Sequence, residues 1–329
     1  MKTTSRLMAG VATTAVTLGS AMPAFAAEKW DMPMAYAASN FHTENGVEFA
    51  QCVTEGTTGE IEITVHPGGS LFAGADIKRA IQTGQVQIGE RLLSGHQNEN
   101  ALFGFDSVPF LAPSFDDSAK LWEAAKPEIE ALLEEQGLHL LYNVAWPPQG
   151  LYFKKEVNSV EDMAGVKFRS YNNTTARLAE LTGMAPVTIE AAEVSQAFAT
   201  GVAESMISSG ATGYDQKVWE SLTHFYEVDA WLPRNYVMVN ADVWDGLSDA
   251  NKEAINLCAS DAETRGLQMS KDYTQFTYDG LEEGGMIVQP ASEELMSGLR
   301  EIGETMTAEW LEAAGDQGKK LVDAYKAMN

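Results

Sequence analysis

Basic residues are scarce in this chain of 329 residues. It contains 22 Lys and Arg against 47 Asp and Glu, which gives a formal net charge of −25. This much negative charge repels nucleic acid and anionic lipid surfaces, so neither is expected as a partner. It also repels an anionic small molecule at long range. A ligand carboxylate would therefore have to be held by individual cations at its binding site.

Catalytic motifs are also missing. The chain has no G-x-S-x-G segment, no H-E-x-x-H segment and no Walker A segment. Its five histidines are scattered without the spacing of metal ligands. We therefore expect a binding protein rather than an enzyme, with no metal site and no cofactor. An enzyme that acts on a small acid remains the alternative.

Cysteine occurs only twice, as Cys52 and Cys258, each within a segment with a helical pattern. In an exported protein the two thiols could form one disulfide. Two buried and unpaired thiols are an equal alternative, because free cysteine behaves as a small hydrophobic residue. The sequence leaves both states open.

Long apolar runs are absent beyond the N terminus. Lys2 and Arg6 precede an apolar run from Leu7 to Met22, and Ala24-Phe25-Ala26 has the form of a cleavage site. This pattern predicts a secretory signal peptide over residues 1–26 that is removed on export. No later segment holds 18 consecutive apolar residues. We therefore expect no stable membrane insertion after cleavage.

Arg169 is the most informative residue that the chain does contain. Val166 and Phe168 alternate with Lys167 and Arg169, which predicts a strand that ends just before Asn172. An arginine near the C-terminal end of a strand in an α/β domain points toward the crevice where such domains bind ligands. Its five-donor fork matches a carboxylate in bidentate geometry. The alternative is a surface arginine at a strand end.

Predicted strands alternate with predicted helices along the chain. A strand over residues 61–65 precedes a helix that ends at Gly84, and a helix from about Asp116 to Glu135 precedes the apolar run 138–144. This last run has the length of a buried parallel strand. Such alternation predicts an α/β fold with a mostly parallel sheet and helices on both faces.

A helix-end pattern occurs twice. The segment from Ile77 to Val86 and the segment from Val194 to Ala203 both read apolar-x-x-Ala-apolar-x-Thr-Gly before a strand. Shared capping chemistry could explain the similarity, but two similar lobes with a cleft between them explain it more specifically. A helical pattern from Ser248 to about Leu281 is long enough to brace both lobes.

Other polar residues are candidates for the cleft. The loop Ser208-Ser209-Gly210 precedes a helix and offers hydroxyls and backbone N–H groups to a carboxylate, although its composition is also that of an ordinary turn. Glu90 could accept a hydrogen bond from a ligand hydroxyl or pair with Arg169. A surface carboxylate is the alternative for Glu90.

Together these motifs resemble the solute-binding proteins of TRAP transporters, the DctP-type family. Asp162 to Arg169 is similar to the family's D-L-K-G-L-K-x-R, and Ala197 to Val202 is similar to A-L-Q-T-G-V. The segments 82–87 and 107–111 resemble Q-x-G-x-x-D and L-P-F-L. The likeness covers essentially the whole chain after the signal peptide. In this resemblance Arg169 matches the arginine that pairs with the ligand carboxylate.

The resemblance implies a two-lobed periplasmic binding protein fold. Each lobe would hold a mostly parallel sheet flanked by helices, and the long helix would span both. Lobe I would comprise residues 27–146 plus about 237–283, and lobe II residues 147–236 plus about 284–329. The lobes would close around an organic acid by a hinge near Trp146 and Asn235. The closed protein would act in the periplasm and deliver its ligand to the membrane permease subunits.

Departures from the family pattern bear on the ligand. Gln149 stands where sialic-acid-type members have a second arginine, and Ser208 stands where many members have an asparagine. One cation suits a monocarboxylate, whereas a dicarboxylate would need another cation such as Arg91 or Arg234 to reach the cleft. Trp146, Tyr171 and the adjacent Asn172 complete the candidate contacts. Aromatic rings favour an aromatic or apolar monocarboxylate, and a small hydroxy or keto acid is the alternative.

Overall fold

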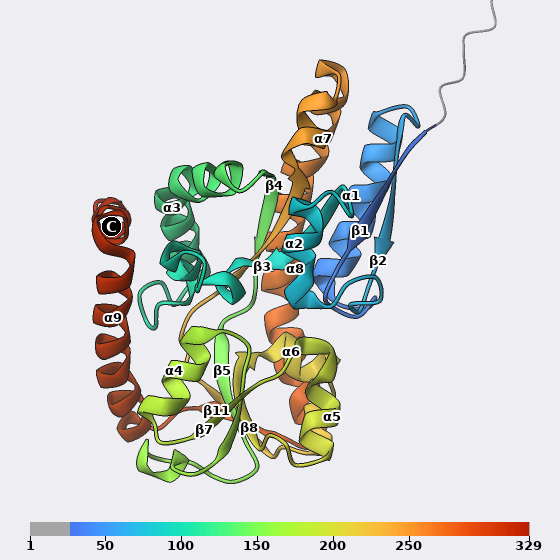
Figure 1. Cartoon of the computed structure of the whole chain (residues 1–329). Coiled ribbons are helices and arrows are strands. Elements are labelled where there is room, and N and C mark those ends of the chain that lie inside the picture. Colours follow the sequence, from blue (N-terminus) through green and yellow to red (C-terminus); the bar gives the residue numbers. More distant parts are fainter. Residues whose placement is uncertain (1–26, 329) are drawn as a thin grey trace, which may run out of the picture.

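The computed structural model describes residues 27–328 and divides into two lobes joined by crossing segments (Figure 1). The predicted signal peptide lies outside the described residues. Lobe I, the upper lobe in Figure 1, contains β1 (Glu28–Pro33), α1 (Phe41–Gly56), β2 (Ile61–His66), α2 (Ile77–Gln82), β3 (Ile88–Leu92), α3 (Phe115–Glu135), β4 (Leu138–Ala145), β10 (Arg234–Asn240) and α7 (Ala241–Gly246).

Lobe II lies below it in the same view. It contains β5 (Gln149–Phe153), β6 (Lys167–Ser170), α4 (Asn173–Leu181), β7 (Ala185–Thr188), α5 (Val194–Ala199), β8 (Ser205–Ser209), α6 (Gly210–Asp215), β9 (His224–Glu227) and β11 (Ile287–Pro290). Gly84 and Gly201 follow α2 and α5 with φ of 67° and 71°. The repeated helix-end pattern of the sequence therefore marks one matching turn in each lobe, where glycine relieves the strain of positive φ.

The sheets are mixed. In lobe II the order is β11-β9-β5-β8-β6-β7, and β5 is antiparallel to both of its neighbours while the other pairs are parallel. In lobe I, β1 pairs with β2 in parallel, and β10 lies between β3 and β4, antiparallel to both. The two-lobed α/β fold is thus confirmed. The expected parallel pairing of 138–144 is wrong, because its partner β10 enters lobe I from lobe II and runs in the opposite direction.

Two long helices connect the lobes. α8 (Asp249–Glu283) contacts α1 and β4 in lobe I and α6 and β11 in lobe II, as its sequence pattern predicts. Ser248 caps it by accepting a hydrogen bond from the backbone N–H of Asn251. The second is α9 (Glu293–Lys326), which runs along the side of both lobes (Figure 1).

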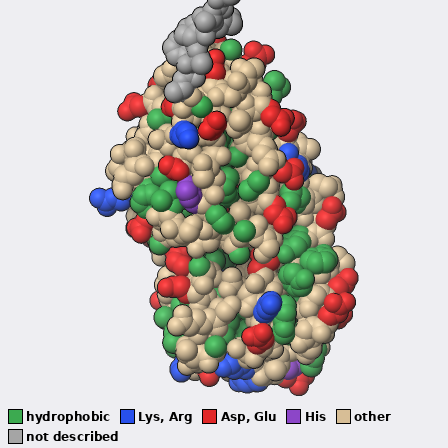
Figure 2. Space-filling view, turned by 90° about the vertical axis from the view of Figure 1, so that its right-hand side faces the viewer, with side chains coloured by type: hydrophobic (Ala, Val, Ile, Leu, Met, Phe, Trp, Pro, Cys, Tyr) green, Lys and Arg blue, Asp and Glu red, His purple; other side chains and the backbone are tan. Residues whose placement is uncertain are grey.

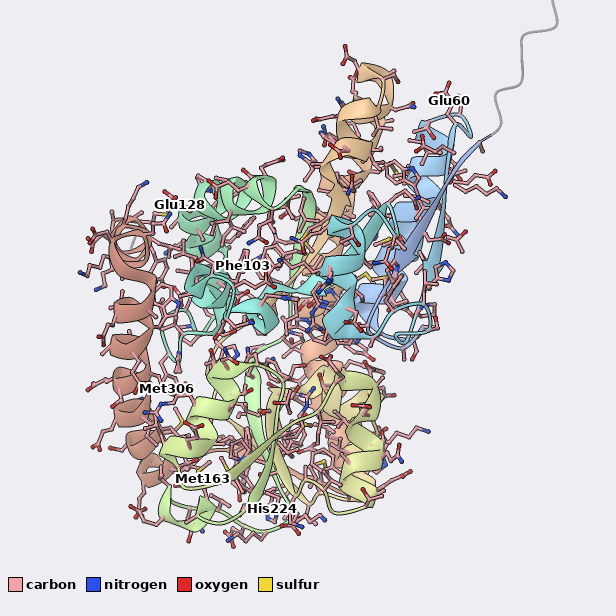
Figure 3. All side chains as sticks on the ribbon, viewed as in Figure 1. Glu60, Phe103, Glu128, Met163, His224 and Met306 are labelled. Carbon is pink, nitrogen blue, oxygen red and sulfur yellow. A yellow bond between two sulfur atoms is a disulfide. The ribbon has the colours of Figure 1, made fainter. Side chains whose placement is uncertain are left out.

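α9 bends at Gly315, whose φ of 59° and ψ of −140° are not helical. Before the bend, Leu299 and Met306 pack into the core of lobe II, and Figure 3 shows Met306 on the part of α9 beside that lobe. After the bend, Leu321 and Tyr325 join the core of lobe I. The end of α9 therefore packs differently from our assignment of 284–329 to lobe II, because the bend redirects the helix. The other lobe boundaries remain a proposal.

Cys52 of α1 and Cys258 of α8 form a disulfide. The bond closes a loop with a sequence separation of 206 residues and lies in the core of lobe I. This settles the alternative that the sequence left open. No free cysteine occurs among the described residues.

Acidic side chains are spread over both lobes of the face in Figure 2. Within residues 27–328, no helix has the length and apolar character needed to cross a membrane.

Candidate functional site

A pocket lies between the two lobes, with about 430 Å³ of empty space that is partly open to solvent. Lobe I and the connecting segments contribute apolar and aromatic groups and one arginine, and lobe II contributes most of the polar groups. The lining residues are Tyr36, Arg91, Leu92, Trp146, Gln149, Arg169, Tyr171, Glu190, Ala191, Ser208, Ser209, Thr212 and Pro233. The predicted candidates Arg169, Trp146, Gln149, Tyr171, Ser208 and Ser209 thus share one cavity.

Arg169 lies on β6, where it is paired in register with Met206 of β8, and only 3% of it is exposed. Its Nε donates to the backbone carbonyl of Ile189 at 2.9 Å, and its guanidinium lies 5.1 Å from the centre of the Tyr171 ring. Burial lowers its pKa from the usual value, although Tyr171 and Glu190 oppose this shift. Within residues 27–328 it forms no ion pair. A buried cation without a carboxylate partner provides a site for an anion.

Tyr171 and Gln149 form a hydrogen-bonded wall next to Arg169. The Tyr171 hydroxyl donates to Oε1 of Gln149 at 3.1 Å and accepts from Nε1 of Trp231 at 3.0 Å. Nε2 of Gln149 donates to the Pro147 carbonyl at 3.1 Å. Burial raises the pKa of Tyr171 above its usual range, so this hydroxyl stays protonated. The wall is therefore neutral and fixed in orientation.

Ser208 and Ser209 lie at the carboxyl end of β8, the strand that pairs with β6. Ser208 is paired in register with Gly150 of β5, and Ser209 caps α6 by accepting from the backbone N–H of Thr212 at 3.3 Å. The carbonyl of Ser209 accepts a hydrogen bond from the Tyr152 hydroxyl at 2.9 Å. These hydrogen bonds fix the loop, and Ser208, Ser209 and Thr212 line the pocket.

Trp146 and Tyr36 form the aromatic side of the pocket. Their ring centres lie 4.8 Å apart in an edge-to-face arrangement. Nε1 of Trp146 donates to Oδ1 of Asn235 at 2.8 Å, and Nδ2 of Asn235 donates to Oε1 of Glu90 at 2.9 Å. The indole N–H is therefore already bonded, and the indole offers its apolar face to a ligand. The ring of His42 also packs against the indole, and its two buried nitrogens have no hydrogen-bond partner among the described residues.

Three sequence candidates do not line the pocket. Glu90 is buried behind Trp146, bonded to Asn235 and 3.4 Å from Nδ1 of His42. Asn172 caps α4, with its Oδ1 accepting from the Thr175 N–H at 2.8 Å. Gly210 lies against α8, where an added Cβ would stand 2.6 Å from Oγ1 of Thr277. Glu90 faces away because alternate residues of a strand point to opposite faces, and its neighbour Arg91 takes the pocket side.

Arg91 and Glu190 also line the pocket. The sequence suggested Arg91 only as a second cation for a dicarboxylate, and it did not suggest Glu190. Arg91 comes from β3 in lobe I, and Glu190 follows β7 in lobe II. Nη1 of Arg91 lies 3.5 Å from Oε2 of Glu190. Successive side chains of β3 point to opposite faces, so Arg91 could have been identified once it was known that Glu90 points away from the pocket. Nothing local in the sequence marks Glu190.

Direct hydrogen bonds join the lobes around the pocket. Nδ2 of Asn172 donates to Oγ of Ser94 at 3.0 Å, and Nδ2 of Asn40 donates to Oδ2 of Asp215 at 2.7 Å. Nε2 of Gln97 donates to Oγ1 of Thr174 at 2.8 Å. These contacts need both lobes at this separation, so the structure is a closed arrangement.

No group of three or more His, Cys, Asp or Glu side chains within residues 27–328 is placed to hold a metal ion. The arrangement is that of a closed pocket with an unpaired cation, a neutral polar wall and an aromatic wall. It can hold a small anion with an apolar or flat body.

Residues 34–313 match the family model for bacterial extracellular solute-binding proteins of family 7, DctP. A TRAP solute-binding protein from a marine metagenome, specific for pyroglutamate and crystallised with co-purified pyroglutamate, is 53% identical. The match has a TM-score of 0.91 and covers 92% of this chain and 100% of that one. DctP6 of Bordetella pertussis, an extracytoplasmic solute receptor that binds pyroglutamic acid, is 44% identical. Its TM-score is 0.90, over 91% of this chain and 100% of that one.

A curated relative is more distant. A monocarboxylate 2-oxoacid-binding periplasmic protein of Nostoc is 25% identical over 289 residues, which are 83% of this chain and 77% of that protein. The similarity therefore extends over most of both chains in each comparison.

Proposed function

Because this chain belongs to the family 7 bacterial extracellular solute-binding proteins, the DctP proteins of TRAP transporters, we propose that its ligand is pyroglutamate. Binding of a small organic acid is the activity of the family. The observation that carries the choice is the pocket of Arg169, a buried cation without a carboxylate partner among the described residues. Pyroglutamate-binding proteins that are 53% and 44% identical support it.

The chemistry of pyroglutamate suits the lining of the pocket. Its single carboxylate would pair with Arg169, whose free Nη groups offer a bidentate fork. Its flat lactam ring would lie against Trp146 and Tyr36. The lactam N–H and C=O need one acceptor and one donor, and the hydroxyls of Ser208 and Thr212 can serve as either. Binding at these residues is part of the proposal.

A small 2-oxo or hydroxy acid is the second candidate, and the Nostoc relative favours it. Such an acid shares the carboxylate but lacks the lactam N–H. The aromatic monocarboxylate that the sequence favoured stays a prediction for the same screen. All of these ligands are monoanions, so Arg169 would have the same role for each.

The proposed cycle begins with export by residues 1–26 and continues in the periplasm. Ligand binds between open lobes, and closure forms the contacts Asn172–Ser94 and Asn40–Asp215. Closure removes water around Arg169 and strengthens the ion pair with the ligand. The closed form would then be read by membrane permease subunits. The protein would release its ligand chemically unchanged, as a carrier rather than an enzyme.

A thermal-shift screen tests the ligand. The mature chain is unfolded and refolded to remove co-purified ligand, and then titrated with pyroglutamate, 2-oxobutyrate, lactate, benzoate and succinate. A ligand that binds only the folded protein raises Tm by mass action. We expect the largest shift with pyroglutamate. A larger shift with any other acid contradicts the assignment, and mass spectrometry of the incubated ligand checks that it is recovered intact.

A further inference from the structure

Three charged side chains line the pocket: Arg169, Arg91 and Glu190. The other lining residues carry no charge at neutral pH, and burial raises the pKa of both Tyr36 and Tyr171 above the usual range. The lining therefore carries two positive charges and one negative charge. Its net charge matches one carboxylate of a ligand.

Arg91 and Glu190 are held together by both lobes. Arg91 is 5% exposed, and its Nη1 lies 3.5 Å from Oε2 of Glu190. An added Cβ on Gly74 would lie 2.8 Å from that oxygen and 2.9 Å from Nη1. An added Cβ on Gly95 would lie 2.7 Å from Nη2 of Arg91. Because Gly74 and Gly95 have no side chains, there is room for Arg91 and Glu190 to pair here.

The groups behind Arg91 do not cancel its charge. Nε of Arg91 donates to Nε2 of His96 at 3.3 Å. Burial, and then Arg91 itself, lower the pKa of His96 to about 4, so the ring is neutral and accepts this bond. Glu99 is bonded to Nζ of Lys78, and Glu90 is turned toward Asn235 and His42. Among the described residues Glu190 is the carboxylate that pairs with Arg91 at the pocket.

We propose that Glu190 sets the charge that the pocket accepts: by pairing with Arg91 across the closed cleft, it leaves Arg169 as the single available cation and selects monocarboxylates against dicarboxylates. This inference rests on the proposed function, because it concerns the same site. A dicarboxylate would place its second carboxylate beside Glu190, where like charges in a closed pocket repel each other. Removal of Glu190 would release Arg91 to receive that second carboxylate.

The pair also has a consequence for Arg91. If Arg91 alone were removed, Glu190 would remain as an unpaired carboxylate in the pocket and would repel even a monocarboxylate. Removal of both side-chain charges would restore the original net charge. A double-mutant cycle therefore separates charge balance from direct ligand contact, because only charge balance predicts recovery in the double variant.

The experiment uses four refolded full-length mature proteins: wild type, Glu190→Gln, Arg91→Gln and the double variant. Calorimetry measures Kd for pyroglutamate and for glutarate, a dicarboxylate with the same number of carbons. We expect Glu190→Gln to shift the ratio of the two Kd values at least about ten-fold toward glutarate. We expect Arg91→Gln to weaken pyroglutamate at least about ten-fold and the double variant to return to within about three-fold of wild type.

Glu193→Gln is the matched control, because it removes an exposed carboxylate of the same segment that does not line the pocket. It should leave the ratio unchanged. An unchanged ratio in Glu190→Gln, or a double variant as weak as Arg91→Gln, overturns the inference. If wild type does not bind pyroglutamate, the proposed ligand is wrong. The same cycle is then run with the monocarboxylate that the thermal screen returns and its dicarboxylate of equal carbon number, and the same two outcomes overturn the inference.

Discussion

Arg169 in lobe II and Arg234 in lobe I are both buried arginines on strands, with 3% and 5% of each exposed. Their surroundings differ. Nη1 of Arg234 donates to Oδ1 of Asn143 at 2.6 Å, and its Nη2 donates to the carbonyl and hydroxyl of Ser118 at 3.0 and 3.1 Å. Among residues 27–328, Arg169 donates only from Nε, to a backbone carbonyl, and its side chain lines the pocket.

The difference shows that burial alone does not identify a binding arginine. Both Nη groups of Arg234 donate to other residues of the protein, although its buried Nε has no hydrogen-bond partner among the described residues. These bonds assign Arg234 to the stability of the fold. The guanidinium of Arg169 keeps donors for a ligand, and its burial costs stability until a ligand arrives. The same substitution at the two positions should therefore have opposite effects.

The first prediction concerns ligand binding by Arg169 and has the greatest magnitude. Arg169→Gln should weaken pyroglutamate at least about 100-fold, or about 3 kcal/mol, because it removes a buried charge-assisted pair. The Tm of the ligand-free protein should be unchanged or higher, because an unpaired buried charge is lost. Calorimetry and thermal melts measure the two quantities. Affinity near that of wild type would show that the carboxylate is held elsewhere.

The second prediction concerns the contribution of Arg234 to the stability of the fold. Arg234→Gln should lower the free energy of unfolding by about 3 kcal/mol, because Asn143 and Ser118 lose their buried partner. Denaturant titration of the ligand-free protein measures this loss. Refolded protein should still bind pyroglutamate within about five-fold of wild type, since Arg234 does not line the pocket. A loss of affinity without a loss of stability would reverse the roles of the two arginines.

The third prediction concerns the pH dependence of stability at Asp106, which is bonded to the backbone of Arg234. Asp106 accepts a hydrogen bond from the backbone N–H of Arg234 at 2.9 Å, and burial raises its pKa from 3.8 to about 7. The folded state therefore binds a proton between these values that the unfolded state does not. Stability should rise as pH falls from 7 toward 4, by about 3 kcal/mol from this group, because each unit of pKa shift is worth about 1.4 kcal/mol.

Asp106→Asn should remove that contribution. The difference in unfolding free energy between wild type and this variant should shift in favour of wild type as pH falls from 7 to 4. Chemical denaturation at four pH values measures it. A difference that does not change with pH would show that Asp106 ionises at its ordinary value in the folded protein.

The fourth prediction concerns the hydrogen-bonded wall beside Arg169, where we expect only a small change in affinity. Tyr171→Phe removes the hydroxyl that links Gln149 and Trp231, so both lose a hydrogen-bond partner next to Arg169. We expect Kd for pyroglutamate to rise about five-fold, or about 1 kcal/mol. Ser159→Ala is the matched control, since it removes a hydroxyl of lobe II that does not line the pocket. An equal change in the control would assign the effect to general stability.

Much of the fold could be predicted because its signals are local. The pattern from Ser248 to Leu281 identified α8 to within two residues at its end, and the two Thr-Gly turns identified matching positions in the lobes. The direction of β4 could not be predicted in this way. It depends on β10, which is almost 100 residues later in the chain and returns from the other lobe.

The residues of the site differ in the same way: some are marked by a local sequence signal, and others are placed only by tertiary contacts. Arg169 could be predicted because a strand end and a cation coincide in one short segment. Glu90 was chosen over Arg91 because the sequence does not show which face of β3 meets the cleft, and a shift by one residue exchanges the two faces. Glu190 meets Arg91 only when two lobes close. Contacts of that kind depend on tertiary geometry, which no local pattern contains.

The most direct test is a crystal structure of the refolded protein with pyroglutamate. We predict density for one ligand in the closed pocket, with both carboxylate oxygens within hydrogen-bond distance of the Arg169 guanidinium and with Arg91 still paired to Glu190. A ligand carboxylate bound to Arg91 or to the Ser209 loop, with Arg169 free of it, would contradict the central claim that Arg169 is the anchor of this site.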